Sequence, residues 1–167
     1  MTMKPDLFTK ICEFYRLFVR LLNASQNVVL LGVRLIWGSS FALAGWGKWN
    51  NISNVIEFFT ELGIPFPAVN AYLVATTELV GGTFLLLGLL SRLTAIPMII
   101  TMIVAYVSSE PEALQALFQG DPDLFFSASP FLFLFGSLLI LFFGPGCISL
   151  DHLLAKIFPP ENPKKSQ

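Results

Sequence analysis

The chain has 167 residues, of which 54% are hydrophobic and 13% are charged. Soluble domains are about 45–50% apolar and about 25% charged, so this composition is too apolar for an ordinary soluble core and excludes a disordered chain. The net charge of −1, without a long basic run, argues against nucleic-acid binding, and one histidine with two distant cysteines leaves little for a metal site or a disulfide framework.

Residues 1–26 are predicted to form an amphipathic helix that lies in the membrane interface. On a period of 3.6 residues, one face of this helix is apolar and the opposite face is charged. The apolar face contains Leu7, Ile11, Phe14, Phe18, Leu21 and Leu22. Charged residues recur every three or four positions, which excludes the central apolar run of a cleavable signal peptide.

Four later stretches qualify as spanning helices, which need about 20 mainly apolar residues. They run over about 28–46, 68–90, 93–107 and 124–143, the third being short. We therefore predict an all-α fold, a polytopic four-helix membrane bundle over residues 27–147. The amphipathic helix over 1–26 precedes it, and a cytoplasmic tail over 148–167 follows it.

The loops between these spans are expected to contain short helices. In the first loop, Ser53 can cap a helix that runs to about Leu62, and Gly63 suits the left-handed closing position. In the second loop, Pro111 suits the first helical position and Gly120 suits the stop.

A glycine–proline–glycine sequence at residues 144–146 predicts a hard break after the fourth span. After it, Ser149 can cap a short amphipathic helix in the tail. Pro97 is expected to bend the third span. Gly38 and Ala42 have the small-xxx-small spacing that lets membrane helices approach closely.

The positions of lysine and arginine predict that both termini lie in the cytoplasm. Eight basic residues fall on one side of the predicted spans: Lys4, Lys10, Arg16, Arg20, Arg92, Lys156, Lys164 and Lys165. The opposite side has Lys48 alone, among six acidic residues.

Two charged residues fall inside predicted spans, where an unpaired charge is costly. At about 1.5 Å per residue, Arg34 lies about 10 Å and Glu78 about 18 Å from the cytoplasmic ends of their spans. Neighbouring antiparallel spans would bring the two together, with Ser39, Ser40 and Thr77 close by. We interpret these five residues as a candidate cofactor-binding cluster, which would act as a polar anchor for a lipophilic ligand or as a proton-handling site. The alternatives are a buried pair that only fixes helix register, and two charges that do not meet.

No catalytic or metal-binding pattern is evident. The lone histidine, His152, falls in the tail beside Asp151, and no intramembrane histidine is present to bind haem or copper. The chain itself has no catalytic motif and no motif that ligates a metal or haem cofactor, which favours a protein that is not an enzyme.

Several segments, taken in order, resemble the DoxX family of bacterial membrane proteins over about residues 28–155. They are Arg34-Leu35, Ala44-Gly45-Trp46-Gly47-Lys48, the loop at 62–68, Glu78, Gly81, Gly82, Gly88, Arg92, Gly144-Pro145-Gly146 and Ser149-Leu150-Asp151.

The resemblance implies a four-helix protein of the inner membrane. The family takes its name from relatives of a membrane subunit of thiosulfate:quinone oxidoreductase. By analogy, we expect a non-catalytic subunit or accessory of a membrane-associated or thiol-linked oxidoreductase, in contact with the lipid bilayer and able to contact quinone. Two other functions stay open: a small-lipophile binding or transport protein, and a structural protein of the envelope. The oligomeric state stays open as well.

Overall fold

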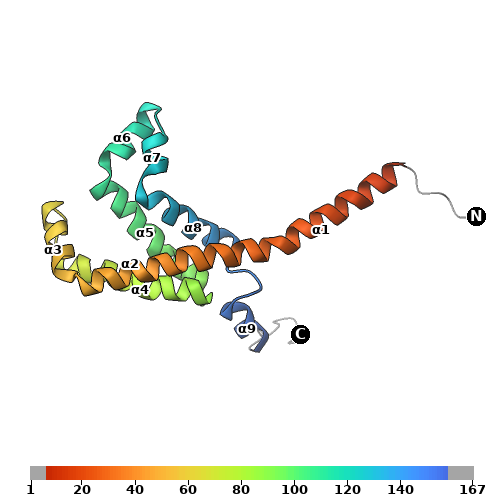
Figure 1. The fold of residues 1–167 in the computed structure, drawn as a ribbon, viewed down its shortest axis with the longest axis horizontal. Coiled ribbons are helices and arrows are strands. Elements are labelled where there is room, and N and C mark those ends of the chain that lie inside the picture. The colour runs from red at the N-terminus through yellow and green to blue at the C-terminus, as the bar shows by residue number, and fades with distance from the viewer. Residues whose placement is uncertain (1–6, 158–167) are drawn as a thin grey trace, which may run out of the picture.

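A computed structural model of the protein describes residues 7–157, and in this part of the chain it contains helices and no strand (Figure 1). The elements are α1 (Leu7–Val33), the π-helical turn η1 (Arg34–Gly38), α2 (Ser39–Asn50), α3 (Ile52–Glu61), α4 (Pro67–Leu87), α5 (Ser91–Ser109), α6 (Pro111–Gln119), α7 (Asp123–Ser127), α8 (Ser129–Phe143) and α9 (Leu150–Ile157). The predicted all-α class is confirmed. Residues 1–6 and 158–167, which include Lys4, Lys164 and Lys165, lie outside the described residues.

The first helix is longer than the sequence indicates. The helix expected over the first 26 residues is present from Leu7, but it does not end at residue 26. It continues through η1 into α2, so Thr9–Asn50 forms one helix of 42 residues. Figure 1 shows α1 projecting well beyond the rest of the bundle.

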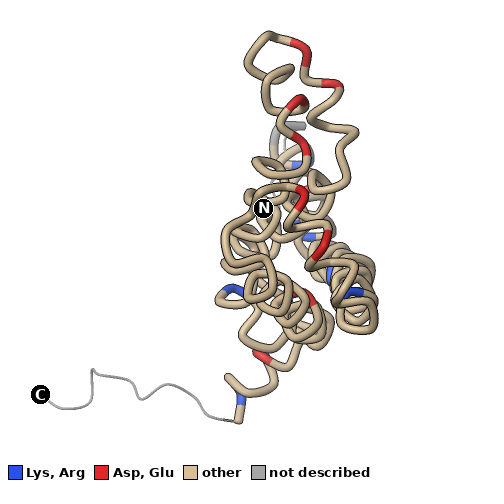
Figure 2. Tube along the Cα trace, turned by 90° about the vertical axis from the view of Figure 1, so that its left-hand side faces the viewer, with Lys and Arg blue, Asp and Glu red and all other residues tan. Residues whose placement is uncertain are grey.

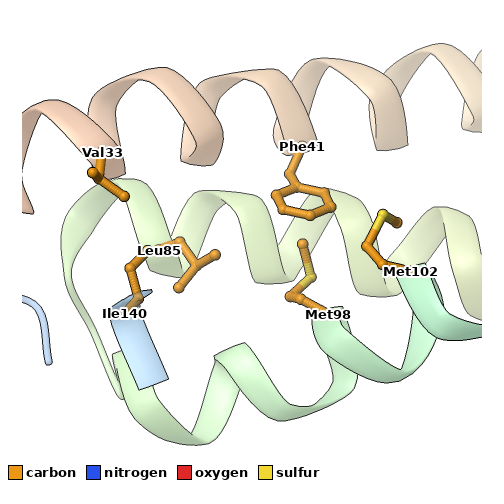
Figure 3. Packing of buried hydrophobic residues seen from close by; sticks show 6 residues of the cluster. All are labelled: Val33, Phe41, Leu85, Met98, Met102 and Ile140. Atoms are coloured by element: carbon orange, nitrogen blue, oxygen red, sulfur yellow. The ribbon is translucent and has the colours of Figure 1, made fainter. Parts of the chain in front are cut away.

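Two pairs of helices form the body of the bundle. α2 packs along α4, and α5 packs along α8 (Figure 1). The pairs are joined by a tight turn in which Gly88 and Leu90 have left-handed backbone conformations, with φ of 71° and 47°. All four helices contribute to one apolar core, which contains Val33, Phe41, Leu85, Met98, Met102 and Ile140 (Figure 3).

Three helices are long and apolar enough to cross a membrane: Thr9–Asn50, Pro67–Leu87 and Ser91–Ser109. The fourth predicted span, over 124–143, is interrupted. α7 ends at Ser127, Ala128 is extended with ψ of 140°, and α8 begins at Ser129. Pro130 explains the interruption, because it has no N–H to donate and its ring would clash with the preceding turn of a continuous helix.

The short loop helices agree with the sequence except at one cap. Gly63 and Gly120 close α3 and α6 with φ of 68° and 90°, as predicted. The cap assigned to Ser53 is wrong, because α3 begins at Ile52 and Ser53 lies in its first turn. Asn51 precedes that turn and makes no side-chain capping bond.

The C-terminal segment folds back onto the turn between α4 and α5. The predicted break is confirmed by φ of 77° at both Gly144 and Gly146, and Ser149 caps α9 by accepting the N–H of His152 at 3.2 Å. The Asp151 carboxylate accepts the N–H groups of Leu90 at 2.7 Å and of Ser91 at 3.0 Å. It therefore satisfies the first free donors of α5 from a segment 60 residues away.

We expect Asp151→Ala to lower the free energy of unfolding by about 1–2 kcal/mol, the usual loss when a helix cap and its favourable charge are removed. Thermal unfolding of the purified protein in detergent would measure this loss. His152→Ala, one residue further along α9, is the matched control and should change the stability little. Equal stability of the two variants would contradict the capping role.

Candidate functional site

Arg34 is buried and all its hydrogen bonds go to backbone carbonyl oxygens. Its Nε donates to Leu85 at 2.9 Å and its Nη2 to Leu86 at 2.8 Å. Its Nη1 donates to Pro145 at 3.0 Å and to Ile148 at 2.5 Å. The guanidinium thus joins the C-terminal end of α4 to the segment that follows α8.

This environment gives Arg34 a structural role. The last carbonyls of a helix have no partner within it, and a cation there also interacts favourably with the helix dipole. Gly88 completes the fit, since a Cβ at this position would lie 2.5 Å from Nη2 of Arg34. The sequence therefore needs glycine here both for the left-handed backbone and for the space that the guanidinium occupies.

Glu78 forms an ion pair with Lys48 of α2, through Oε2 and Nζ. The predicted pairing of Glu78 with Arg34 is wrong. The register of α2 against α4 explains why: a Cβ on Gly38 would meet the backbone of Leu86, and one on Gly45 would meet the backbone of Leu79. Glu78 therefore lies opposite the turn of Gly45, about 16 Å along the helix from Arg34.

Lys48 is a site residue that the sequence indicated only as the single basic residue on the outer side and as part of the family resemblance. It lies three residues after Gly45, on the same face of α2, and that face packs against α4. The spacing of Lys48 from a close-packing glycine is the feature that could have identified it. A long lysine side chain can then reach back to a carboxylate deeper in the bundle.

The three hydroxyl residues expected around Glu78 make no hydrogen bond to it and do not line the pocket described next. Ser39 donates to the carbonyl of Leu35 at 2.5 Å, and Ser40 donates to that of Ile36 at 2.8 Å, so both bond within their own helix at η1. Thr77 is half-buried.

A pocket of about 460 Å³ opens beside the Lys48–Glu78 pair. It lies between the α2–α4 pair and the α5–α8 pair, and α3 contributes to its wall. Most of its wall is apolar, with aromatic side chains from Phe41, Phe58, Phe59 and Phe133. Lys48 and Glu78 are the charged residues of the lining, whereas Arg34 is not part of it.

Three other polar side chains of the lining, those of Asn70, Thr101 and Ser108, donate hydrogen bonds to carbonyls near their own positions. The hydroxyl of Thr101 donates to the carbonyl of Pro97 at 2.9 Å, and that of Ser108 donates to Val104 at 2.8 Å. The ion pair keeps more capacity: Lys48 has three N–H donors and uses one on Glu78, which in turn offers its second oxygen. The pocket can thus hold an apolar molecule and both donate to and accept from its polar end.

No cluster suited to a metal ion occurs within residues 7–157, where no three histidine, cysteine or acidic side chains gather. The site consists of an ion pair set in an apolar wall.

The family model for DoxX matches residues 29–111, the segment that contains Arg34, Lys48, Glu78 and the turn after α4. The chain belongs to the DoxX family. "Uncharacterized membrane protein Rv3486" of Mycobacterium tuberculosis (strain ATCC 25618 / H37Rv) is 34% identical over 143 residues, which cover 82% of this chain and 88% of that protein. "Inner membrane protein YqjF" of Escherichia coli (strain K12) is 30% identical over 132 residues, 78% of this chain and 95% of that protein.

A third DoxX-type relative has a name that refers to an activity. "Putative oxidoreductase CatD" of Bacillus subtilis (strain 168) is 28% identical over 135 residues, which cover 81% of this chain and 93% of that protein. No solved structure matches the chain. The comparisons and the apolar helices together make this an all-α, membrane-embedded DoxX protein.

Proposed function

We propose that this DoxX protein binds a small lipophile of the quinone class in the pocket beside Lys48 and Glu78. We further propose that it serves a membrane-associated oxidoreductase system as a non-catalytic accessory. The observation that carries the proposal is an apolar pocket of about 460 Å³ whose charged lining consists of one ion pair.

The pocket suits a ring with oxygen substituents. Ligand pockets of this kind have volumes of about 300–1,000 Å³, apolar walls and a few polar groups that fix the ligand's orientation. A quinone carbonyl can accept a hydrogen bond from Lys48, and a quinol hydroxyl can donate one to the free oxygen of Glu78. The aromatic side chains around the pair suit the ring and its apolar substituents.

The redox part of the proposal has a separate basis. It is supported by the name of the Bacillus subtilis relative and by the family resemblance. Neither lysine nor glutamate exchanges electrons with a quinone, so the proposal assigns electron transfer to a partner enzyme and ligand binding to this chain.

We also propose a bacterial-type inner-membrane location with four spans, the fourth formed by α7 and α8, and with both termini in the cytoplasm. Within the described residues, the end of the bundle near α3, α6 and α7 is acidic, and Figure 2 shows the red residues of the α6–α7 region at the top. Its acidic residues are Glu57, Glu61, Glu110, Glu112, Asp121 and Asp123. The opposite end contains Lys10, Arg16, Arg20, Arg92 and Lys156, which favours the cytoplasm for that end. The pocket, to which α3, Ser108 and Ser109 contribute, then lies toward the outer face.

A quinone with a short tail, decylubiquinone, should raise the thermal unfolding midpoint of the purified protein. In Lys48→Met/Glu78→Met its Kd should be about 10- to 100-fold weaker, because one charge-assisted hydrogen bond contributes about 1.5–3 kcal/mol. The double variant removes both charges together, which avoids leaving one buried charge unpaired and so keeps the protein folded. Titration of the midpoint shift would give the Kd, and Thr77→Val on the same helix is the control.

The outcomes separate the candidate functions. Equal affinity of the double variant and Thr77→Val would contradict binding at the ion pair. If decane raises the thermal unfolding midpoint of the wild type as much as decylubiquinone does, the result would favour a general lipophile carrier. Native mass spectrometry of the protein released from membrane-derived nanodiscs tests the accessory role, since it should detect a co-purifying oxidoreductase subunit. Release of the protein alone would contradict that role.

A further inference from the structure

The N-terminal half of α1 lies outside the bundle. The bundle ends on this helix near Asn27, whose Oδ1 accepts the N–H of Cys147 at 2.9 Å, and near Leu30, which packs against Gly146. Residues 9–26 extend about 27 Å further, and Figure 1 shows no other described element beside them. Every side chain over 9–26 is exposed or half-buried.

This projecting segment has a wide apolar face. The large apolar side chains between Ile11 and Leu22 are 49–72% exposed: Ile11, Phe14, Tyr15, Leu17, Phe18, Leu21 and Leu22. At about 100° per residue, the apolar arc from Leu17 to Cys12 covers about 220°, with Lys10 near one edge. The seam of a coiled coil is much narrower than this arc, so one partner helix would leave most of it in water. Immersion in the boundary layer of a membrane covers an arc of this width.

The opposite face is basic. It carries Arg16, Arg20 and Glu13, a net charge of 2 − 1 = +1, and Lys10 near the edge of the apolar arc raises the net charge of residues 9–26 to +2. Arg16, Arg20 and Glu13 lie together on the polar side of the helix. Anionic lipid headgroups attract basic residues on the polar face of such a helix.

A polar stretch separates this segment from the spanning part of the helix. It consists of Asn23-Ala24-Ser25-Gln26-Asn27, and the Ser25 hydroxyl donates to the carbonyl of Leu22 at 2.8 Å. Hydroxyl bonds of this type to a preceding turn often bend helices. About 20 residues suffice to cross the membrane core, which residues 30–50 provide. A straight α1 would therefore hold the apolar arc in water, whereas a bend over 23–27 would lay it on the membrane.

α9 independently marks this end of the bundle as a membrane surface. Leu153, Leu154 and Ile157 are 41–58% exposed on a short amphipathic helix. Asp151 of the same helix is fixed to Leu90 and Ser91, at the end of the bundle from which α1 projects. Both α9 and the projecting part of α1 are thus amphipathic helices with exposed apolar faces at the same end of the bundle.

We propose that residues 9–26 bind the anionic phospholipids of the adjoining leaflet, with α1 bending over residues 23–27 to lie on the membrane surface. This interaction is independent of the pocket and of its ligand. The apolar arc enters the lipid, while Arg16 and Arg20 contact the phosphate groups.

The native cysteines allow a direct test in the full-length protein. Cys147→Ser leaves Cys12, which lies in the projecting segment, as the single cysteine. A nitroxide on Cys12 is compared in nanodiscs of phosphatidylcholine with and without phosphatidylglycerol. We expect phosphatidylglycerol to lower its collision rate with a water-soluble nickel chelate and to raise its collision rate with oxygen.

Charge variants test the anionic part of the proposal. Each basic residue near such a surface contributes about a fivefold change in binding, so Arg16→Gln/Arg20→Gln should shift the docking equilibrium about 20- to 30-fold toward the undocked state. Glu13→Gln, on the same polar face, is the matched control and should shift it the opposite way. High salt should reproduce the effect of the arginine variant.

Three results would overturn the proposal. Equal collision rates in the two lipid compositions would show that anionic lipid does not bind the segment. Dipolar coupling between Cys12 labels on two chains would show that a second copy covers the face. Unchanged docking in both charge variants would show that Arg16 and Arg20 do not contact the headgroups.

Discussion

Arg34→Ala is expected to abolish folding of the bundle. The substitution removes the donor of the carbonyl groups of Leu86, Pro145 and Ile148. The carbonyl of Leu85 also loses a donor, but it still accepts the N–H of Gly88 at 3.1 Å. Each buried group left unsatisfied costs about 1–3 kcal/mol, or about 3–9 kcal/mol for the three. The free energy of unfolding of a whole domain is about 5–15 kcal/mol, so this one side chain accounts for much of it.

Size-exclusion chromatography of detergent extracts would measure the amount of folded protein. Arg34→Lys should recover part of the folded protein, because an ammonium still offers three donors. The recovery should be incomplete, because lysine lacks the planar guanidinium that reaches four oxygens. Arg92→Ala is the matched control. Arg92 lies at the same end of the bundle, but it is exposed and makes one long bond, 3.4 Å to the carbonyl of Phe142. Equal yields of Arg34→Ala and Arg92→Ala would contradict the structural role of Arg34.

The helices could be predicted because their causes are local. Apolar stretches of spanning length gave the three long helices, and Gly63, Gly120 and Gly144 marked turns that require positive φ. Pro130 also allows the break at Ala128 to be predicted, although the apolar residues on both sides of the break favoured one continuous span. The continuation of α1 past residue 26 could not be predicted, because the polar residues at 23–27 are compatible both with a continuous helix and with the end of one.

The candidate site could be predicted only in part, because it depends on how two helices align. Glu78 was identified from its charge within an apolar span. Arg34 was assigned as its partner from the distance of each residue to the expected cytoplasmic end of its helix. The first helix extends beyond that expected end, so the distance for Arg34 had the wrong starting point. The alignment is set by the close packing of Gly38 and Gly45 against α4, which places Lys48 near Glu78.

Arg34 and Glu78 lie in different parts of the bundle, so their variants test different properties of the protein. Arg34 stabilises the end of the bundle where α4, α5 and the C-terminal segment lie together. Lys48 and Glu78 lie toward the other end, where the two helix pairs enclose the pocket. A loss of ligand binding in an Arg34 variant would therefore follow from lost folding, whereas the Lys48–Glu78 variant tests binding itself.

Gly45→Ala should force α2 and α4 apart. Its Cβ would lie 2.7 Å from Cα of Leu79 and 2.8 Å from the carbonyl oxygen of Ala75, distances that only a backbone shift can relieve. Overpacking costs about 1–3 kcal/mol where side chains can adjust, and we expect the upper end of that range or more between two backbones. The shift also moves Lys48, three residues on, away from Glu78, so the affinity for decylubiquinone should fall together with the stability.

Gly47→Ala is the matched control, because a Cβ on Gly47 meets nothing within 4 Å. Both substitutions replace a glycine of α2 with a better helix former, a gain of up to about 1 kcal/mol that applies to each. Their difference in thermal unfolding midpoint therefore isolates the contact with α4. We expect Gly47→Ala to match or exceed the wild type and Gly45→Ala to fall below it. A midpoint for Gly45→Ala equal to that of Gly47→Ala would contradict the close packing of α2 on α4, and with it the register that places Lys48 beside Glu78.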